Sequence, residues 1–331
     1  MDKKHNFKVP SVTFTGDGSS RRVGFELEFS GLTLEETVDN VLASLGGNTG
    51  VKTAAEQLIH VPSLGDFNVE IDWDFLKRTA KANEHNKEDG KEEEWLEQLS
   101  KVASALVPVE VVCPPIPITN LNLLAPMVSR LRSAGAVGTE ESLIAAYGVH
   151  INTEIPNLDA ETLFAYLQSF SLLQWWLVEA HHVNTSRKIS PYIDLYPENY
   201  VKLLASQTSP SMDKIFDDYL EYNASRNRAL DLLPLLAEID KKRVFNKVDD
   251  PKIKSRPAFH YRLPNCNIEH KDWSLAQSWN IWWVVEQLAH RPDDLKELSA
   301  AFLDAEQAII GVIRNKWVKY LDQWLKDHEL A

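Results

Sequence analysis

The chain has 331 residues, 44% of them hydrophobic, and a formal net charge of −13 at pH 7. Its length suits one large or two ordinary domains, and its hydrophobic content supplies a sizeable core. The acidic balance argues against nucleic acid as the main partner, because phosphate backbones are bound by basic surfaces.

The cysteine content and the N-terminal stretch indicate the compartment. Only Cys113 and Cys266 occur, so the chain has neither a disulfide framework nor a cysteine-based zinc motif. Residues 1–20 are polar, without an apolar signal-peptide core, and no apolar run is long enough to span a membrane. We therefore expect a cytoplasmic protein with no membrane partner. Its flexible arm would cover 1–20 and its single domain 21–331.

Residues 23–29 alternate apolar and polar, which is typical of a strand with one buried face. The alternation places Glu26 and Glu28 on the other face, about 7 Å apart along the strand. Taken alone, these carboxylates are either ordinary solvent-facing residues or half of a site for a hard divalent cation.

The other elements expected in the first half follow from periodicity and from capping signals. Thr33 and Glu36 form a capping box ahead of a helix over 34–45, which Gly46 ends. The remaining elements, in chain order, are a β region over 51–61, a strand over 67–73, a charged stretch over 77–90 that is either a solvated excursion or a helix end, a helix over 91–106, a strand over 108–113, a helix over 120–134 and a strand over 145–155.

The second half is predicted to be mainly helical. Residues 159–180 form a long helix that is apolar nearly all round and therefore buried. Helical segments continue to about 240, a short strand covers 259–263, and helices cover 275–289 and most of 293–328. Because regular strand–helix alternation is missing, we expect an α+β fold with an antiparallel sheet, helices on one face and a helix-rich C-terminal half.

The predicted strands share a second property, because their polar positions carry carboxylates, imidazoles and a guanidinium. Ordinary solvent-facing positions carry more Thr, Lys and Ser, so this set indicates a site for a divalent cation and a nucleotide. Its members are Glu26, Glu28, Glu70, Asp72, Glu110, His150, Asn152, His260 and Arg262.

Several arginines are candidates for binding an anion. Arg226 and Arg228 lie in an Arg- and Asn-rich stretch, which is either a capped helix start with solvent-facing arginines or a clamp for phosphate or a substrate carboxylate. Arg187 is a further candidate of the same kind, and Arg256, just before the last strand, ranks below it. Arg22, together with Arg21, is expected at the mouth of the site.

Five short motifs follow one another along the chain, and they are Gly24–Phe29, Gly65–Asp72, Glu110–Pro115, Tyr147–Asn152 and Phe259–Pro264. Their order resembles that of the amidoligase family, within the glutamine synthetase-like superfamily of carboxylate–amine ligases. Cys113 stands where the family motif has Ser, and His260 stands where the superfamily often has a metal-binding Glu.

The resemblance implies a curved antiparallel sheet that holds ATP and Mg²⁺ or Mn²⁺ on its concave face. It also implies ATP-dependent joining of a carboxylate to an amine or ammonia through an acyl phosphate. Arg262 would contact the phosphoryl group, while Glu70 or Asp72 would support the metal or take the proton of the amine. The implied metal ligands are Glu26, Glu28, Glu110, His150 and His260, with His260 acting instead on phosphate as the alternative. From their residue types and positions, we also expect nucleotide contacts by Arg22, Asn152, Arg187, Arg226 and Arg228.

Two other classes of function stay open at this point. One is a phosphotransferase that uses the same metal site on a nitrogen acceptor, and the other is a non-catalytic protein that binds nucleotides or partners. The sequence does not specify the carboxylate, which would belong to a small molecule or a peptide, nor the amine. An amidase or amidotransferase is a candidate partner.

Overall fold

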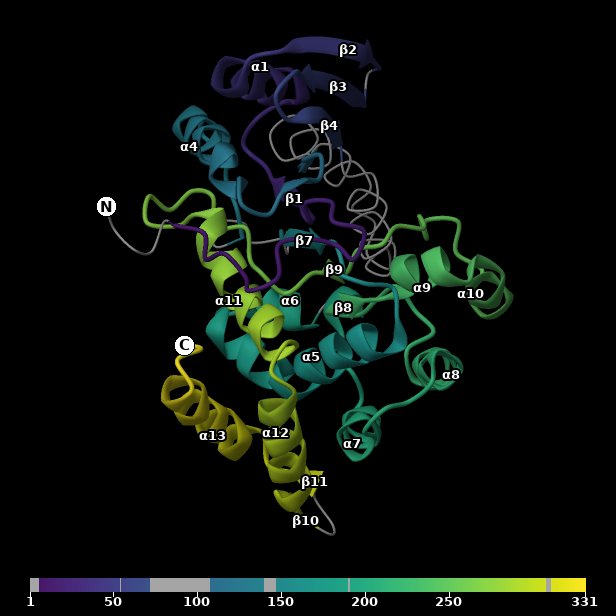
Figure 1. The fold of residues 1–331 in the computed structure, drawn as a ribbon. Helices are drawn as coiled ribbons and strands as arrows, with labels where there is room; N and C mark the ends of the chain where they lie inside the picture. Colours follow the sequence, from purple (N-terminus) through teal and green to yellow (C-terminus); the bar gives the residue numbers. More distant parts are fainter. Residues whose placement is uncertain (1–5, 54, 72–107, 140–146, 190, 308–310) are drawn as a thin grey trace, which may run out of the picture.

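The structure is a computed structural model that describes residues 6–53, 55–71, 108–139, 147–189, 191–307 and 311–331. Within these residues, nine strands form one open antiparallel sheet, in the order β2-β3-β4-β5-β1-β7-β9-β8 with β6 paired to β1 (Figure 1). Helices pack against its apolar face, and most of them come from the second half of the chain. The predicted α+β fold with a curved antiparallel sheet is confirmed.

Strand β1 (Arg22–Phe29) lies inside the sheet between β5 (Val109–Val112) and β7 (Val149–Thr153). Its four apolar side chains on one face have no solvent exposure: Val23, Phe25, Leu27 and Phe29. Because strand side chains alternate, Glu26 and Glu28 point to the opposite side. We call that side, which carries the predicted site, the polar face.

The first wing of the sheet is an antiparallel meander of β2 (Asn48–Lys52), β3 (Glu56–Val61) and β4 (Gly65–Ile71). The β region predicted over 51–61 therefore contains the end of β2 and all of β3. Helix α1 (Leu34–Leu45) contacts β3 and β4, and it begins at the predicted capping box of Thr33 and Glu36. Helix α4 (Ala125–Ala134) packs beside α1, after a 3-10 turn over Leu121–Leu124. The elements expected over 77–90 and 91–106, and Asp72, lie outside the described residues.

The second wing consists of two very short strands, β9 (His260–Tyr261) and β8 (Leu230–Asp231). Aromatic packing from α5 (Ala160–Ala180) and α11 (Leu275–Leu288) supports them from behind. The rings of Tyr261 and Trp282 have centroids 4.8 Å apart, and those of Phe259 and Tyr166 stack at 4.9 Å. These contacts hold the backbone that presents His260 and Arg262.

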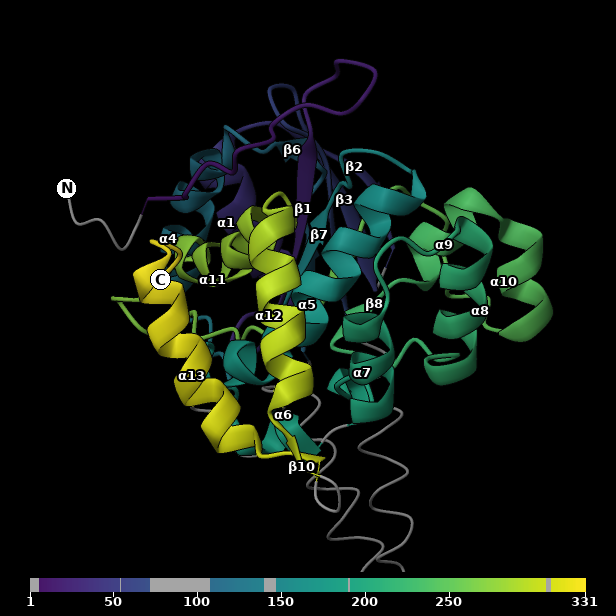
Figure 2. The ribbon, with the colours of Figure 1, turned by 60° about the horizontal axis from the view of Figure 1, so that its bottom comes forward.

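The remaining elements surround this core and complete the helix-rich half. Figure 2 shows α12 in front of α5 and α13 beside α12, and an edge-to-face contact of Phe302 with Trp317 at 5.0 Å joins α12 and α13. No helix among the described residues is long and apolar enough to cross a membrane. These elements are β6 (Ile116–Pro117), α6 (Thr185–Ile189), a 3-10 turn over Pro191–Ile193, α7 (Glu198–Ser206), α8 (Met212–Tyr222), α9 (Leu233–Ile239), α10 (Lys241–Lys247), α12 (Pro292–Asp304), β10 (Glu306–Gln307), β11 (Gly311–Val312) and α13 (Arg314–Asp327).

The described part of the N-terminal segment is anchored to α11, whereas the sequence suggested a flexible arm. The indole N–H groups of Trp279 and Trp283 donate to the carbonyls of Lys8 and Val9, at 2.7 and 3.0 Å. The Lys8 ammonium also lies 4.3 Å from the Trp283 ring centroid, a cation–π distance. Residues 1–5 lie outside the described residues.

Arg21 was expected beside Arg22 at the mouth of the site, and the structure corrects this. Its side chain has no solvent exposure and pairs with the equally buried Glu286 of α11 at 2.9 Å. The phenol of Tyr166 and the indole of Trp282 also donate to the Glu286 carboxylate, at 2.7 and 3.0 Å. Strand parity explains the error, because Arg21 falls on the buried side of β1 and Arg22 on the polar side.

We expect Glu286→Gln to lower the free energy of unfolding by about 3–5 kcal/mol, because it leaves the Arg21 guanidinium buried without its counter-charge. Urea unfolding followed by circular dichroism measures this change. The matched control is Asp322→Asn, which breaks the exposed pair of Asp322 with Lys326 and should cost under about 1 kcal/mol. Equal losses in the two variants would contradict the central role of the buried pair.

His181 ends α5 and is the clearest acid-sensitive group outside the polar face. Burial, followed by the nearby Arg187 charge, lowers the pKa of His181 from 6.5 to about 3. Its Nε2 atom is enclosed and has no hydrogen-bond partner among the described residues. As the pH falls, the His181 imidazole is therefore protonated near pH 6.5 in the unfolded chain, whereas in the folded protein it stays neutral until about pH 3. The resulting stability is present above about pH 6.5 and is lost as the pH falls toward 3.

Replacing this imidazole should flatten the acid limb of the stability curve. We expect His181→Leu to reduce the slope of unfolding free energy against pH between 6.5 and 4 by at most about 1.4 kcal/mol per pH unit. His182→Asn, at the exposed neighbour with φ of 48°, is the control, since Asn tolerates that backbone conformation. An unchanged slope in His181→Leu would show that His181 is protonated in the folded protein.

Candidate functional site

A row of carboxylates crosses the polar face at the first wing. The antiparallel register pairs Glu56 with Glu70, Glu70 with Glu110, and Glu110 with Glu28, so four adjacent strands each contribute one. Burial and then the Glu56 charge raise the pKa of Glu70, although the hydrogen bond to Glu110 opposes the rise. Such a row concentrates negative charge that a cation or an ammonium group would relieve.

Two groups of side chains in this region could hold a metal ion. In each group, one ligand atom per residue lies within 4.8 Å of the others. Ligand atoms at about 2.0–2.6 Å from a shared cation lie at most about 4–5 Å apart, so small side-chain movements suffice. Carboxylates with imidazoles suit Mn²⁺ and related divalent ions, and the carboxylate-rich group also suits Mg²⁺. The groups are Glu26, His150 and His260, and Glu28, Glu110 and His150.

His150 belongs to both groups because its two ring nitrogens face different carboxylates. Nδ1 lies 2.7 Å from Glu26 Oε2, and Nε2 lies 3.7 Å from Glu28 Oε1. A neutral imidazole has one lone pair for a metal, so His150 completes one group at a time. The Gly148 N–H donates to Glu28 Oε2 at 2.8 Å and fixes that carboxylate against β7.

Glu26 is the link between the acidic and the basic parts of the polar face. Asn152 Nδ2 donates to Glu26 Oε1 at 2.8 Å, and Arg256 Nη2 donates to Asn152 Oδ1 at 2.8 Å. Burial by itself would raise the pKa of the Glu26 carboxyl, but its imidazole neighbours and Arg256 hold it well below its usual range. Glu26 is therefore ionised and oriented on both oxygens.

His260 lies next to Glu26 as a neutral imidazole. Burial and then the Arg262 charge lower the pKa of His260 to about 3, so it keeps a lone pair for a metal near pH 7. Its Nε2 lies 3.7 Å from Glu26 Oε2 and 3.3 Å from His150 Nδ1. Its Nδ1 faces Arg262 Nη2 at 3.2 Å and the buried carboxylate of Asp231 at 3.8 Å.

Two residues that the sequence interpretation ranked low or left out belong to this site. Arg256 donates to Asn152, and its positive charge lies close to the Glu26 carboxylate. Two other arginines, Arg262 and Arg226, are also near it. Asp231 pairs with His260 in the β8–β9 register and is wholly buried. Neither residue stands in a period-2 pattern, because Arg256 precedes β9 in a loop and β8 has two residues.

The structure places the other sequence candidates as follows. Arg187 is buried, and its guanidinium donates to the carbonyls of Arg262, Leu263 and Pro264 at 2.6–2.7 Å. It lies over Gly148, where an added Cβ would come within 2.5 Å of it. These bonds fix the backbone around Arg262 and use the donors that a nucleotide would need.

The remaining arginines differ in how free their guanidinium groups are. Arg22 is exposed at the start of β1 and donates to the Pro115 carbonyl at 3.1 Å. Arg228 donates to the Tyr222 carbonyl at 3.0 Å, which is a structural contact. Arg226 lies 3.8 Å from Asp250, and its Nε, like that of Arg228, Arg256 and Arg262, is buried without a hydrogen-bond partner among the described residues.

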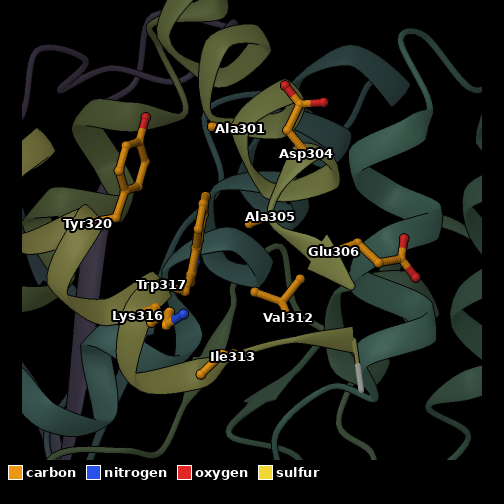
Figure 3. A pocket seen from close by; sticks show the side chains of 9 residues that line it. All are labelled: Ala301, Asp304, Ala305, Glu306, Val312, Ile313, Lys316, Trp317 and Tyr320. Atoms are coloured by element: carbon orange, nitrogen blue, oxygen red, sulfur yellow. The ribbon is translucent and has the colours of Figure 1, made fainter. Parts of the chain in front are cut away.

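A cavity of about 380 Å³ lies elsewhere, between α12, the β10–β11 hairpin and α13. Figure 3 shows the Trp317 indole in its centre, with Val312 and Ala305 on one side and Tyr320 on the other. Its lining is mainly apolar, and Glu306 at its rim is already paired with Lys202 at 2.6 Å. Neither metal-ligand group reaches this cavity, so it is not part of the candidate site.

Comparison with known proteins gives one result that bears on this geometry. No curated protein and no solved structure matches the chain. A family model described as "Putative amidoligase enzyme" matches residues 19–284, which include every strand of the sheet and end within α11. The match covers well over half of the chain and contains all of the motifs that carried the resemblance. The chain therefore belongs to the family of putative amidoligase enzymes.

Proposed function

We propose that the protein is an ATP-dependent carboxylate–amine ligase that uses Mg²⁺ or Mn²⁺ and proceeds through an acyl phosphate. The observation that supports this most is the arrangement of the polar face, where two metal-ligand groups share His150. At the edge of these groups, Arg256 lies beside Glu26 through Asn152, and Arg262 lies beside His260. An enzyme that phosphorylates a carboxylate needs such neighbouring sites for cations and for anionic oxygens.

ATP and a carboxylate bring several negative charges together beside an already acidic face. Bound divalent cations would supply charge neutralisation at the phosphate oxygens and would orient the triphosphate. Glu26, Glu28, Glu110, His150 and His260 are the residues that would hold them.

In the first step, an oxygen of the substrate carboxylate attacks the γ-phosphorus and the bond to ADP breaks. The Arg262 guanidinium, whose Nε–H has no hydrogen-bond partner among the described residues, stabilises the charge on the transferred phosphoryl group. Arg256 and Arg226 hold further phosphate oxygens, since their Nε–H groups are also unused there. Arg22, exposed at the end of β1, contacts the distal part of the nucleotide.

In the second step, a neutral amine attacks the acyl carbon, an amide bond forms and inorganic phosphate leaves. Glu70 accepts the proton that the amine nitrogen loses, and its raised pKa makes it a better base than an ordinary carboxylate. Asp72, outside the described residues, is the other candidate for this role. The acidic row beside Glu70 favours binding of an ammonium or amine-bearing substrate.

The substrate classes follow from this chemistry. The donor is a small-molecule or peptide carboxylate, and the acceptor is an amine or ammonia. An amidase or amidotransferase in the same compartment, a reducing cytoplasm, would supply ammonia or act on the amide product.

Metal binding tests the ligand groups without any substrate. We expect Mn²⁺ to bind the free protein and Glu26→Gln to weaken that binding by at least about 10–100-fold, because a charged ligand is lost. Isothermal titration calorimetry measures the affinity. Glu56→Gln is the control, because Glu56 lies on the same face but in neither group. Equal affinities in wild type and Glu26→Gln would refute the assignment.

Activity is tested by ADP release with Mg–ATP over a panel of amino acids, peptides and amines, with amide products identified by mass spectrometry. Hydroxylamine serves as a general acceptor, since it traps an acyl phosphate as a hydroxamate. We expect Glu28→Gln and Arg262→Gln each to lower kcat by roughly 10²–10³-fold, the usual cost of losing one electrostatic stabiliser. Asp322→Asn, in the exposed pair with Lys326 away from the polar face, should keep most of the activity.

The products separate the competing classes of function. A stable N-phosphate in place of an amide would identify a phosphotransferase. ADP release with no product that depends on both substrates would contradict ligation. Absence of Mg–ATP binding at millimolar concentration would identify a non-catalytic protein.

A further inference from the structure

Asp231 is a buried carboxylate that the chemistry described so far does not use. It has no solvent exposure, and the β8–β9 register sets it directly beside His260. Its Oδ1 accepts the backbone N–H of Leu233 at 3.0 Å, where α9 begins. Its Oδ2 points the other way, 3.5 Å from Arg262 Nη2 and 3.8 Å from His260 Nδ1.

These three atoms form a triangle that allows two proton arrangements. Arg262 Nη2 also lies 3.2 Å from His260 Nδ1, so Arg262 can donate to that nitrogen if His260 carries its proton on Nε2. Alternatively, His260 carries its proton on Nδ1, and both His260 and Arg262 donate to Asp231 Oδ2. A movement of about 1 Å or less brings both donors to hydrogen-bond distance in the second arrangement.

Charge favours the second arrangement. In the first, the bare Nδ1 lone pair of His260 faces a buried carboxylate oxygen, and two acceptors repel. In the second, one ionised oxygen accepts two N–H groups inside the protein, where charge-assisted bonds are strongest. The second arrangement also suits the other edge of the ring. His150 Nδ1 lies 2.7 Å from the Glu26 carboxylate and carries the proton between them, so it can also donate to the bare Nε2 of His260 at 3.3 Å. That Nε2 lone pair faces the other members of its ligand group.

We propose that Asp231 is the positioning residue that holds the proton of His260 on Nδ1 and thereby fixes the metal-binding tautomer. The cation-binding part of this inference rests on the proposed function. Asp231 Oδ2 also lies 3.5 Å from Arg262 Nη2, so one carboxylate serves the metal ligand on one side and the phosphate-binding group on the other. A carboxylate behind a metal-binding imidazole is a known way to set its tautomer.

The test is Asp231→Asn, which keeps an oxygen for the Leu233 N–H and places an NH₂ group where Oδ2 was. That NH₂ donates to His260 Nδ1, so the imidazole proton moves to Nε2 and blocks the ligand position. We expect Mn²⁺ affinity to fall by about 10–100-fold, the usual effect of losing a partner behind a ligand. Asp218→Asn is the control, because Asp218 is also buried but pairs with Lys214 away from the polar face.

Nitrogen-15 NMR of the imidazoles, recorded on cation-free protein, decides the tautomer independently of activity. His260 is assigned by its loss in His260→Gln. We expect the proton on Nδ1 in wild type and on Nε2 in Asp231→Asn. The proton on Nε2 in both proteins would overturn the inference, whether or not Mn²⁺ binds. If the tautomer changes as expected but the wild type does not bind Mn²⁺, the proposed metal site is refuted instead.

A double-variant cycle excludes a merely structural effect. In the His260→Gln background, Asp231→Asn should cost no further Mn²⁺ affinity, because its effect passes through the imidazole. Additive losses would overturn the inference. Urea unfolding of each variant confirms that the proteins compared are folded.

Discussion

The register of β1 against β5 and β7 is the constraint on which the site depends. A shift of one residue would turn Phe25 and Leu27 onto the polar face and bury Glu26 and Glu28 without partners. Four fully buried apolar side chains on β1 oppose such a shift, as does the Arg21–Glu286 pair just before it. The same parity sets Glu26 beside His150 and Glu28 beside Glu110, so core packing determines which ligands meet.

The polar face separates charge along the sheet. Its first wing carries the carboxylate row ending at Glu28, and its second wing carries Arg262 and, from the preceding loop, Arg256. Glu26 joins them through Asn152, so neither sign of charge is left uncompensated at the centre. For the ligase that we propose, this order puts the amine at the acidic end and the phosphoryl group at the basic end. The reacting carboxylate would then lie between them.

Periodicity was enough to predict the strands that carry long alternating patterns. The positions of Glu26, Glu28, Glu70, Glu110 and His150 on one face follow from it, because their strands are long enough to show a period of two. It failed where position depends on tertiary contacts. Arg21 and Arg187 are arginines whose donors are used inside the protein, by Glu286 and by three carbonyls, and a sequence does not show such partners.

Asp231 could not be predicted from periodicity either, because it lies on a strand of two residues, which is too short to show an alternating pattern. Its importance comes from His260, a neutral ligand at a position where the resemblance implies a carboxylate. The group of Glu26, His150 and His260 then has a single carboxylate, whereas the group of Glu28, Glu110 and His150 has two. The first is therefore softer and less charged, and the second is harder. Asp231 supplies the negative charge that a carboxylate ligand would have brought to this group, but it lies behind His260 and not against the cation. Because His150 completes one group at a time, the ion that binds should decide which group forms: a softer ion the first and a harder ion the second.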